Sequence, residues 1–291
     1  MCADIGGKGP ESTGRDGGHN YAPVFQMALT MVPRIIATTC GTVRYNRDWL
    51  RYMRAHFVRD TGETLLRFRL RNKQTVVLRA SVRTTLNEIY LHRVYDIPGV
   101  HFRSCRHVFD FGANMGVFAL YIGARAPAAS ISCFEPSTAN FAMLEQNLVA
   151  NQVPARAYRM AISTLPGPRR LSLAAHSGGY ALDRSVDRFE KVECADLAKV
   201  FSLTGVDICD FLKMDIEGEE LNFLLESPID LLRRIRAIAV EWHHSEASLR
   251  GVQSRLERAG FATRVDRVGE QQRQVMLKAV FNGNALRTKF P

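Results

Sequence analysis

Two short apolar segments, each with a carboxylate, carry the residues best suited to chemistry. Asp110 lies in the first, RHVFDFGANMG, and Glu135 ends the second, SISCFEP. Between them, a turn from Gly112 to Gly116 opens a segment with an apolar helical face. Glu135 follows Gly116 by 19 residues, close to the spacing at which an acidic residue meets the ribose hydroxyls of a bound nucleoside. The pattern predicts a strand–turn–helix–strand unit that binds a nucleoside.

The spacing of the glycines narrows the ligand. A dinucleotide-binding turn reads Gly-x-Gly-x-x-Gly, so that its backbone can approach a pyrophosphate. Counted from Gly112, this turn has Asn114 and Val117 at the second and third positions. It therefore favours an adenosine ligand without phosphate, of which S-adenosylmethionine (SAM) is the common one. Asp110 would then face the ammonium of the methionine part. The alternative is an ordinary βαβ unit with a chance turn.

More acidic and histidine residues follow later apolar segments. The segment FLKMDIEGEE places Asp215 and Glu217 after one, and AVEWHH places Glu241 and His243 after another. In an open parallel sheet, ligands bind beyond the carboxyl ends of the strands. These groups should therefore surround the same crevice as Asp110 and Glu135. Together with the turn they are what a class I methyltransferase needs.

Alternating strand and helix patterns position these groups. Seven strands are expected, at residues 108–111, 131–134, 155–162, 211–214, 236–242, 261–265 and 275–281. Because helical patterns separate all but the last two, we predict an α/β, Rossmann-like, doubly wound and mostly parallel sheet with an antiparallel C-terminal edge. Ser137 is the expected N-cap of the helix after Glu135. The long stretch 163–192 is interpreted as a lid or substrate loop, or alternatively as a surface excursion.

The part before this domain has a different pattern. Residues 1–20 are rich in glycine, serine and charge, which predicts a disordered tail. Residues 21–100 are expected to form a small α+β cap, and residues 101–291 the SAM-binding domain. The cap should contain a helix after Asn46, a hairpin of residues 64–70 and 75–78, and a helix at residues 85–95.

Positive charge is concentrated in this cap. Between Arg34 and His107 there are 15 Lys or Arg residues against 5 Asp or Glu, an excess equal to the net charge of +10 of the whole chain. An anionic glycan, a nucleic acid or a lipid-linked substrate at a membrane surface would meet this region. A solvated face in an arginine-biased sequence is the preferred interpretation, because the run lacks a compact basic block.

Composition excludes several other classes. No segment reaches the roughly 18 uninterrupted apolar residues of a membrane span, and the start does not have the pattern of a signal peptide. The six cysteines form no CxxC pair. They predict reduced thiols in a cytoplasmic protein.

Several segments together carry a family resemblance. VFDFGANMG, FEPSTANFAMLEQNLVAN, DFLKMDIEGEE and AVEWH resemble the FkbM family of SAM-dependent methyltransferases, and TLNEIYLHRVYD resembles the segment that precedes the glycine turn in that family. The resemblance covers Leu66 to Phe281, while the region Met1 to Asp60 and the loop Gly178 to Asp187 match little. Proteins of that family are class I folds that mostly methylate hydroxyl oxygens on sugars and natural products. The resemblance implies this O-methyltransferase activity here.

The resemblance also implies roles for matched residues. The methionine part of SAM would lie against the turn and its strand, at Asp110, Gly112, Asn114 and Gly116. Glu135 would bind the ribose. Asn140, or the backbone of Ala161 and Ile162, would lie near the adenine.

Methyl transfer to an alcohol also needs a base. Asp215, next to Lys213 and Glu217, is the first candidate, and His243 is the second because histidine titrates in the useful range. Lys213 belongs to this catalytic set as the group that neutralises the acidic cluster. Asp215 could alternatively cap the helix near Gly218, and Glu241 with His243 could be a satisfied structural pair.

Asp215, Glu241 and His243 could also hold a divalent ion that acidifies the substrate hydroxyl. Because no local ligand motif supports such a site, we expect no metal. The expected acceptor is a small molecule or glycan. An RNA methyltransferase and a non-catalytic SAM-binding protein are the alternatives, although the chain shows no RNA-binding module and keeps its turn and Glu135. Peripheral membrane contact and oligomeric state are left open.

Overall fold

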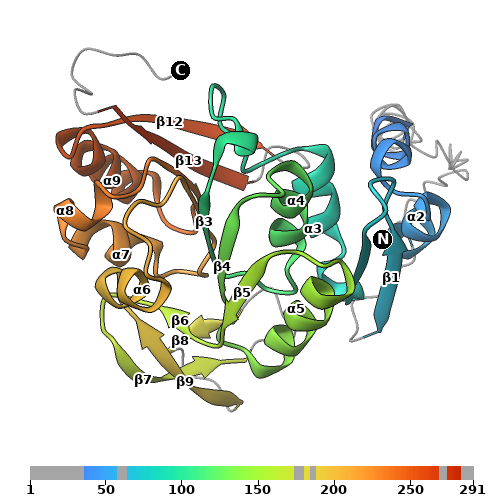
Figure 1. Ribbon diagram of the computed structural model, residues 1–291, viewed down its shortest axis with the longest axis horizontal. Coiled ribbons are helices and arrows are strands. Elements are labelled where there is room, and N and C mark those ends of the chain that lie inside the picture. The colour runs from blue at the N-terminus through green and yellow to red at the C-terminus, as the bar shows by residue number, and fades with distance from the viewer. Residues whose placement is uncertain (1–35, 58–63, 174–179, 184–187, 269–273, 283–291) are drawn as a thin grey trace, which may run out of the picture. The chain divides into compact units, whose positions relative to one another are not determined.

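The computed structural model describes residues 36–57, 64–173, 180–183, 188–268 and 274–282 (Figure 1). Contacts divide the chain into two units, residues 1–40 and 41–291. All the helices and strands named below belong to the second unit. The tail predicted at residues 1–20 lies outside the described residues.

A seven-stranded sheet forms the centre of the second unit, in the order β12–β13–β11–β10–β3–β4–β5. Its strands are β3 (His107–Phe111), β4 (Ser130–Phe134), β5 (Ala155–Tyr158), β10 (Phe211–Met214), β11 (Ala237–Glu241), β12 (Phe261–Val268) and β13 (Gln274–Phe281). Neighbouring strands from β5 to β11 are parallel, and β13 is antiparallel to both β11 and β12. The predicted α/β, Rossmann-like fold is confirmed. The reversed strand lies one position in from the edge.

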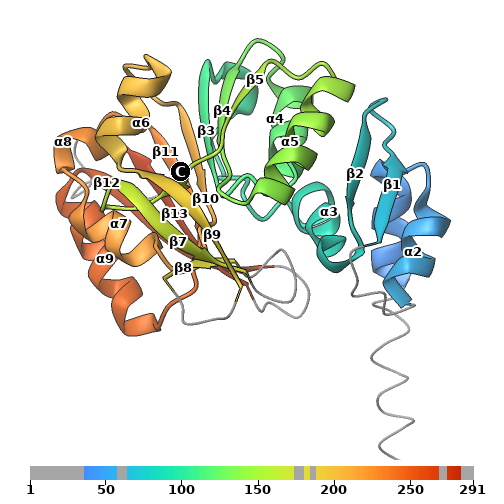
Figure 2. The same cartoon turned by 90° about the horizontal axis from the view of Figure 1, so that it is seen from below.

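Helices cover both faces of this sheet (Figure 2). On one face lie α4 (Val117–Arg125) and α5 (Thr138–Ala150). On the other lie α6 (Leu197–Thr204), α7 (Glu220–Glu226), α8 (Ile229–Leu232) and α9 (Glu246–Arg258). Side chains alternate along a strand, so β3 contributes to the cores on both faces of the sheet. Val108 belongs to the core that contains α4 and α5, whereas Phe109 and Phe111 belong to the core on the other face. Strands buried on both faces account for the continuous apolar segments in the sequence.

The α5 helix begins as its sequence predicts. Ser137 has an extended backbone, and its side-chain oxygen accepts a hydrogen bond from the backbone N–H of Asn140. Such a cap satisfies one of the backbone donors that a helix start leaves unpaired. The prediction of Ser137 as the N-cap is confirmed.

The single strand predicted at residues 155–162 is wrong. β5 ends at Tyr158, whose carbonyl oxygen accepts hydrogen bonds from the N–H groups of both Met160 and Glu135. This tight turn directs Ala161–Ile162 out of the central sheet as β6, which pairs with β9. The pairing with a distant segment could not be read from a local apolar run.

The stretch 163–192 is also more regular than a loop. A second sheet has the order β6–β9–β7–β8. Its strands after β6 are β7 (Gly167–Ser172), β8 (Ala181–Leu182) and β9 (Phe189–Ala195). Residues 174–179 and 184–187, with most of the loop Gly178 to Asp187, lie outside the described residues.

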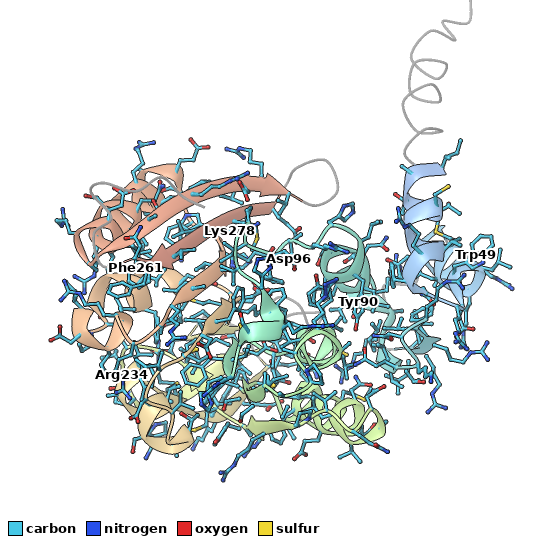
Figure 3. All side chains as sticks on the ribbon, turned by 45° about the horizontal axis from the view of Figure 1, so that its top comes forward. Trp49, Tyr90, Asp96, Arg234, Phe261 and Lys278 are labelled. Atoms are coloured by element: carbon cyan, nitrogen blue, oxygen red, sulfur yellow. The ribbon has the colours of Figure 1, made fainter. Side chains whose placement is uncertain are left out.

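The region before β3 contains the predicted hairpin. β1 (Leu65–Arg69) pairs antiparallel with β2 (Thr75–Arg79), and α2 (Trp49–Phe57), which carries the Trp49 labelled in Figure 3, precedes them. The side chain of Asn147 on α5 accepts a hydrogen bond from the Val77 N–H (2.9 Å) and donates one to the Val77 carbonyl (2.7 Å). The hairpin is therefore fixed to α5 by an amide that imitates a neighbouring strand.

The helix predicted at residues 85–95 is shorter than expected. A short α3 (Thr84–Leu86) continues into the π-helical turn η2 (Asn87–Leu91). Arg93 then adopts a positive φ of 49°, which no continuing helix allows. Two 3-10 turns, η1 (Ala80–Val82) and η3 (Phe102–Ser104), flank this region.

In the part of the chain that the structure describes, no helix is long and apolar enough to cross a membrane. The five cysteines among these residues are free thiols.

Candidate active site

The turn after β3 needs its two glycines. Gly112 has φ +71°, and a Cβ there would lie 1.7 Å from the carbonyl oxygen of Asp215. Gly116 has φ +84°, and its Cβ would lie 2.7 Å from Cδ1 of Leu144 on α5. Both positions therefore disfavour a side chain by conformation, and the fixed backbone carbonyl at Gly112 also excludes one by space. The first glycine lets the turn after β3 contact the residue after β10.

Glu135 closes this turn from the end of β4. Its two carboxylate oxygens accept hydrogen bonds from the backbone N–H groups of Asn114 (2.8 Å) and Ser137 (3.0 Å), and Asn140 Nδ2 lies 3.4 Å away. The residue is only 5% exposed. Burial raises the pKa of Glu135 to about 7, although these hydrogen bonds oppose the shift.

A pocket lies beside this carboxylate at the carboxyl ends of β3, β4 and β10. Six of the residues predicted to bind the cofactor line it: Gly112, Asn114, Glu135, Asn140, Ala161 and Ile162. Apolar residues that the sequence analysis missed complete the wall, among them Met160, Leu171 and Leu182. Two of these belong to the second sheet, whose packing no local pattern indicated. We call this cavity the nucleoside pocket.

A second pocket shares Gly112, Asn114 and Asp215 with the first. It is also lined by groups before β3 that the sequence analysis did not select, including Thr85, Glu88 and Tyr95. Lys213 lines it as well. The two cavities therefore adjoin at these three residues. We call this one the inner pocket.

Asp110 lies beneath the turn rather than in either pocket. It is fully buried, and its Oδ1 lies 3.2 Å from Nζ of Lys213. Nζ also donates to the carbonyl oxygens of Phe111 (3.2 Å) and Gly112 (2.5 Å). Burial raises the pKa of Asp110, and the charge of Lys213 opposes this effect. Burial alone would lower the pKa of Lys213, but Asp110 and Asp215 raise it.

The Tyr95 hydroxyl lies between two acidic residues, Asp215 after β10 and Glu241 at the end of β11. The hydroxyl of Tyr95 lies 3.4 Å from Oδ2 of Asp215 and 3.2 Å from Oε2 of Glu241. Burial, and then the charge of Asp215, raise the pKa of Glu241 to about 8. The pKa of Tyr95 is raised well above its usual value by burial and by the same carboxylates. The phenol is therefore a proton donor between two acids.

His243 lies beside Asp215, and a buried glutamate binds the other nitrogen of its imidazole. Its Nδ1 lies 3.0 Å from Oε1 of the fully buried Glu220, which also accepts hydrogen bonds from two backbone N–H groups, of Ile216 and Gly218. Burial alone would lower the pKa of His243, but the hydrogen bond to Glu220 and the charge of Asp215 raise it to about 10. The same hydrogen bond lowers the pKa of Glu220, which burial alone would raise.

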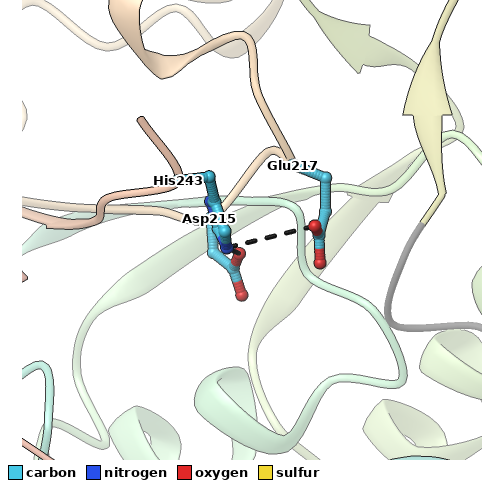
Figure 4. Close-up of side chains that lie close together, drawn as sticks. All are labelled: Asp215, Glu217 and His243. Carbon is cyan, nitrogen blue, oxygen red and sulfur yellow. Dashed lines mark ion pairs between the residues drawn. The ribbon is translucent and has the colours of Figure 1, made fainter. Parts of the chain in front are cut away.

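The other imidazole nitrogen, Nε2, points toward carboxylates. It lies 3.8 Å from Oδ1 of Asp215 and 3.9 Å from Oε2 of Glu217 (Figure 4). Oε1 of Glu241 is 4.0 Å away. One ligand atom each from Asp215, Glu217 and His243 lie within 4.8 Å of one another, so these three could hold a divalent ion. The metal site considered from the sequence had Glu241 in place of Glu217.

The structure thus divides the residues selected from sequence into two groups. The larger group lines the pockets and includes Asp215 and Lys213. Asp110, Gly116 and His243 line neither of the two pockets. Asp110 and His243 contact the lining residues Lys213 and Asp215, and Gly116 shapes the turn.

Comparison with known proteins gives consistent matches. The family model described as the methyltransferase FkbM domain matches residues 110–262. The 31-O-demethyl-FK506 methyltransferase FkbM of Streptomyces tacrolimicus is 30% identical over 236 residues, which are 69% of this chain and 90% of that protein. Methyltransferase 1 of Beauveria bassiana is 25% identical over 203 residues, 62% of this chain and 81% of its own. The structure of the N-terminal domain of human METTL16 in complex with SAH is similar over 69% of this chain and 70% of that one, with 15% identity and a TM-score of 0.44.

Proposed function

We propose that this chain, which belongs to the family of FkbM methyltransferases, transfers a methyl group from SAM to a hydroxyl oxygen of a sugar, glycan or other small natural product. One observation carries the proposal. The glycine turn, Glu135 and Asp215 line one pocket at the carboxyl ends of three parallel strands. This is the position at which open α/β sheets bind their ligands.

The adenosine of SAM would occupy the nucleoside pocket. A carboxylate has about four lone-pair positions, so Glu135 can accept the ribose hydroxyls in addition to its backbone donors. Asn140, Ala161 and Ile162 would lie against the adenine, which the apolar wall suits.

The methionine part would extend along the turn into the inner pocket. Its ammonium would meet the carboxylate of Glu88, and Gly112, Asn114 and Gly116 would shape the turn beside it. Asp110, which lines neither pocket, would act by holding Lys213 in place. The reactive sulfonium would then lie where the two pockets share Gly112 and Asp215.

Asp215 is the base in this proposal. The acceptor oxygen attacks the methyl carbon in line with the sulfur, the carbon–sulfur bond breaks, and the bonding electrons stay on the sulfur of S-adenosylhomocysteine. The hydroxyl proton passes to the Asp215 carboxylate. Alignment of oxygen, carbon and sulfur supplies much of the rate, and the base contributes roughly 10²–10⁴-fold.

His243 is better suited to positioning than to accepting this proton. With a pKa raised to about 10, the imidazole already carries its proton at neutral pH. It faces Asp215 from one side while Glu220 holds it from the other. Lys213 adds a positive charge 3.9 Å from Oδ2 of Asp215. Both cations therefore place positive charge beside the Asp215 carboxylate.

The acceptor class is proposed from the family. The name of the Streptomyces relative describes O-methylation of a natural product, 31-O-demethyl-FK506. The Tyr95 hydroxyl contacts both Asp215 and Glu241. These polar groups beside the proposed base suit an acceptor that has a hydroxyl proton to give up.

The first experiment is calorimetric titration of the full chain with SAM and, separately, with NAD. We expect SAM to bind in the micromolar range and NAD to give no signal. Methyl transfer from isotopically labelled SAM to a panel of sugars, glycans and natural-product alcohols then tests the reaction. Absence of SAM binding would overturn the proposal.

Two other outcomes point to the remaining alternatives. SAM binding with no acceptor in a broad panel would favour a non-catalytic SAM-binding protein. Labelled methyl appearing in RNA, through a complex that weakens steeply with salt, would favour an RNA methyltransferase.

A further inference from the structure

A third cavity lies away from the nucleoside and inner pockets and shares no lining residue with them. Its volume is about 670 Å³, within the range of small-molecule sites. Segments distant in sequence form its wall, namely Gly41 to Tyr45, the tip of the β1–β2 hairpin, η2 and the C-terminal half of α4. The described lining is Gly41, Arg44, Tyr45, Arg71, Asn72, Tyr90, Leu91, Arg93, Tyr121, Ala124 and Arg125.

Four of these residues are arginines, and none of the described residues in the lining is acidic. Arg44, Arg71 and Arg93 are exposed, while Arg125 is half-buried with its guanidinium 4.0 Å from the centre of the Tyr121 ring. Arg71 uses Nε to donate to the carbonyl of Val43 at 2.6 Å, which leaves its terminal N–H groups for a ligand. Guanidinium groups of this kind bind phosphate in pairs of parallel hydrogen bonds.

Three tyrosines form the other part of the wall. The rings of Tyr45 and Tyr90 are stacked with centroids 5.3 Å apart, and Tyr90, labelled in Figure 3, meets Tyr121 edge to face at 5.2 Å. Each hydroxyl donates to a residue outside the lining: to Asn87, Gln74 and Asp96. Burial raises the pKa of all three phenols, so they stay neutral. Tyr45 and Tyr90, which are partly exposed, therefore form an uncharged surface beside the arginines, and the buried Tyr121 packs against Tyr90.

We propose that this cavity binds an organic polyanion, with a phosphate or diphosphate group on the arginines and a ring or apolar part against the tyrosines. Four arginines in a lining whose described residues include no carboxylate select for negative charge, although Asp96 lies behind the Tyr121 hydroxyl. The volume of this open cavity suits a small molecule. Arg44, Arg71 and Arg93 are three of the 15 basic residues in the basic stretch of the sequence. The binding does not depend on the proposed methyl transfer.

The cavity lies close to the inner pocket, because residues of both η2 and α4 line the two sites. On α4, Val117 and Phe118 line the inner pocket, whereas Tyr121 and Arg125 line the cavity. An α-helix rises 1.5 Å per residue, so the two sets of lining residues are separated by about 5 to 12 Å along α4. The polyanion is therefore either the anionic end of a long methyl acceptor or a separate phosphorylated ligand.

Calorimetric titration with inorganic pyrophosphate, uridine 5′-diphosphate and uridine tests the proposal on the full chain. We expect both anions to bind, the nucleotide more tightly, and uridine to give no heat. Arg44→Gln and Arg93→Gln should each weaken binding by about tenfold. Arg103→Gln is the matched control, because it removes the same charge from an exposed residue outside all three cavities.

Three results would overturn the proposal. They are absence of pyrophosphate binding, equal weakening by the Arg103→Gln control, and a short single-stranded RNA that binds more tightly than the nucleotide with no dependence on Arg44. If the nucleotide binds no better than pyrophosphate, the role of the tyrosine wall is wrong.

The methylation assay separates the two sources of the polyanion. Pyrophosphate that competes with the acceptor, together with an Arg44→Gln variant whose KM for the acceptor rises at unchanged kcat, assigns the anion to the acceptor. Pyrophosphate binding with no effect on acceptor kinetics assigns the cavity to a separate ligand. SAM affinity should stay unchanged in both cases. Loss of SAM binding in the unmodified chain would contradict the proposed function and leave the cavity's own test unaffected.

Discussion

Two neighbouring carboxylate sites differ in how their charge is stabilised. Glu135, after β4, receives hydrogen bonds from backbone N–H groups that belong to its own turn and to the glycine turn. Asp215, after β10, meets side chains instead: the Tyr95 hydroxyl, the His243 imidazole and the Lys213 ammonium. Backbone donors cannot titrate, whereas a phenol, an imidazole and a neighbouring acid can. The first environment is suited to holding a ligand and the second to moving a proton.

Removing the proposed base, Asp215, should have the largest effect on turnover and little effect on SAM binding. Asp215→Asn should lower kcat by roughly 10²–10⁴-fold, because the amide keeps the shape of the side chain but cannot accept the hydroxyl proton. The SAM dissociation constant should change by less than about threefold, since most of the nucleoside contacts lie elsewhere. Steady-state kinetics and calorimetry on the same preparation measure both. Near-normal turnover in this variant would remove Asp215 as the base.

The buried pair beneath the turn should control stability. Lys213→Met leaves Asp110 buried without its positive partner, and such a loss costs about 3–5 kcal/mol of unfolding free energy. Urea denaturation of this variant and of the double variant Asp110→Asn/Lys213→Met measures the effect. The double variant should recover part of the stability, because no uncompensated charge remains. Equal stability of the two would mean that the pair does not act as a unit.

Glu135→Gln tests the binding half of the comparison. Loss of the charged acceptor should weaken SAM binding by about 10–100-fold, while kcat at saturating SAM stays within a few-fold of the unmodified chain. Glu145→Gln, on the exposed side of α5, is the matched control and should bind normally. A fall in kcat with unchanged SAM affinity would reverse the roles assigned to the two carboxylates.

The pKa of Glu135 gives a pH dependence with a defined sign. Burial raises it from 4.5 to about 7. In the proposed complex, the ribose hydroxyls would donate hydrogen bonds to the ionised form. SAM affinity should therefore increase several-fold as the pH rises from 6 to 8, with protons released on binding. Calorimetry in buffers of different ionisation enthalpy detects those protons. The trend should disappear in Glu135→Gln, and a pH-independent affinity in the unmodified chain would contradict this explanation.

The smallest expected effect concerns a metal ion. The protonated His243 already supplies positive charge to Asp215 and Glu217, so EDTA should change turnover by less than about twofold. Magnesium or manganese added after EDTA should also have little effect. A large loss of kcat with EDTA, restored by one of these ions and abolished by Glu217→Gln, would instead establish a catalytic metal site at these three residues.

Much of the fold followed from local patterns. Apolar segments buried on both faces predicted the central strands, Ser137 predicted the start of α5, and alternation predicted the β1–β2 hairpin. These signals work because period, cap and turn depend on residues that are neighbours in the chain. The strand predicted at residues 155–162 failed because its second half pairs with β9, more than thirty residues later.

The sequence alone predicted the glycine-turn side of the nucleoside pocket. Gly112, Asn114 and Glu135 lie within one strand–turn–helix–strand unit, whose geometry is set over a few tens of residues. Only the tertiary structure decided the other half. Tyr95 reaches Asp215 and Glu241 across 120 and 146 residues. Glu220, on α7, meets His243 in the loop after β11. Such contacts depend on the order of β3, β10 and β11 in the sheet and on how α7 packs beside it, and no local pattern records either.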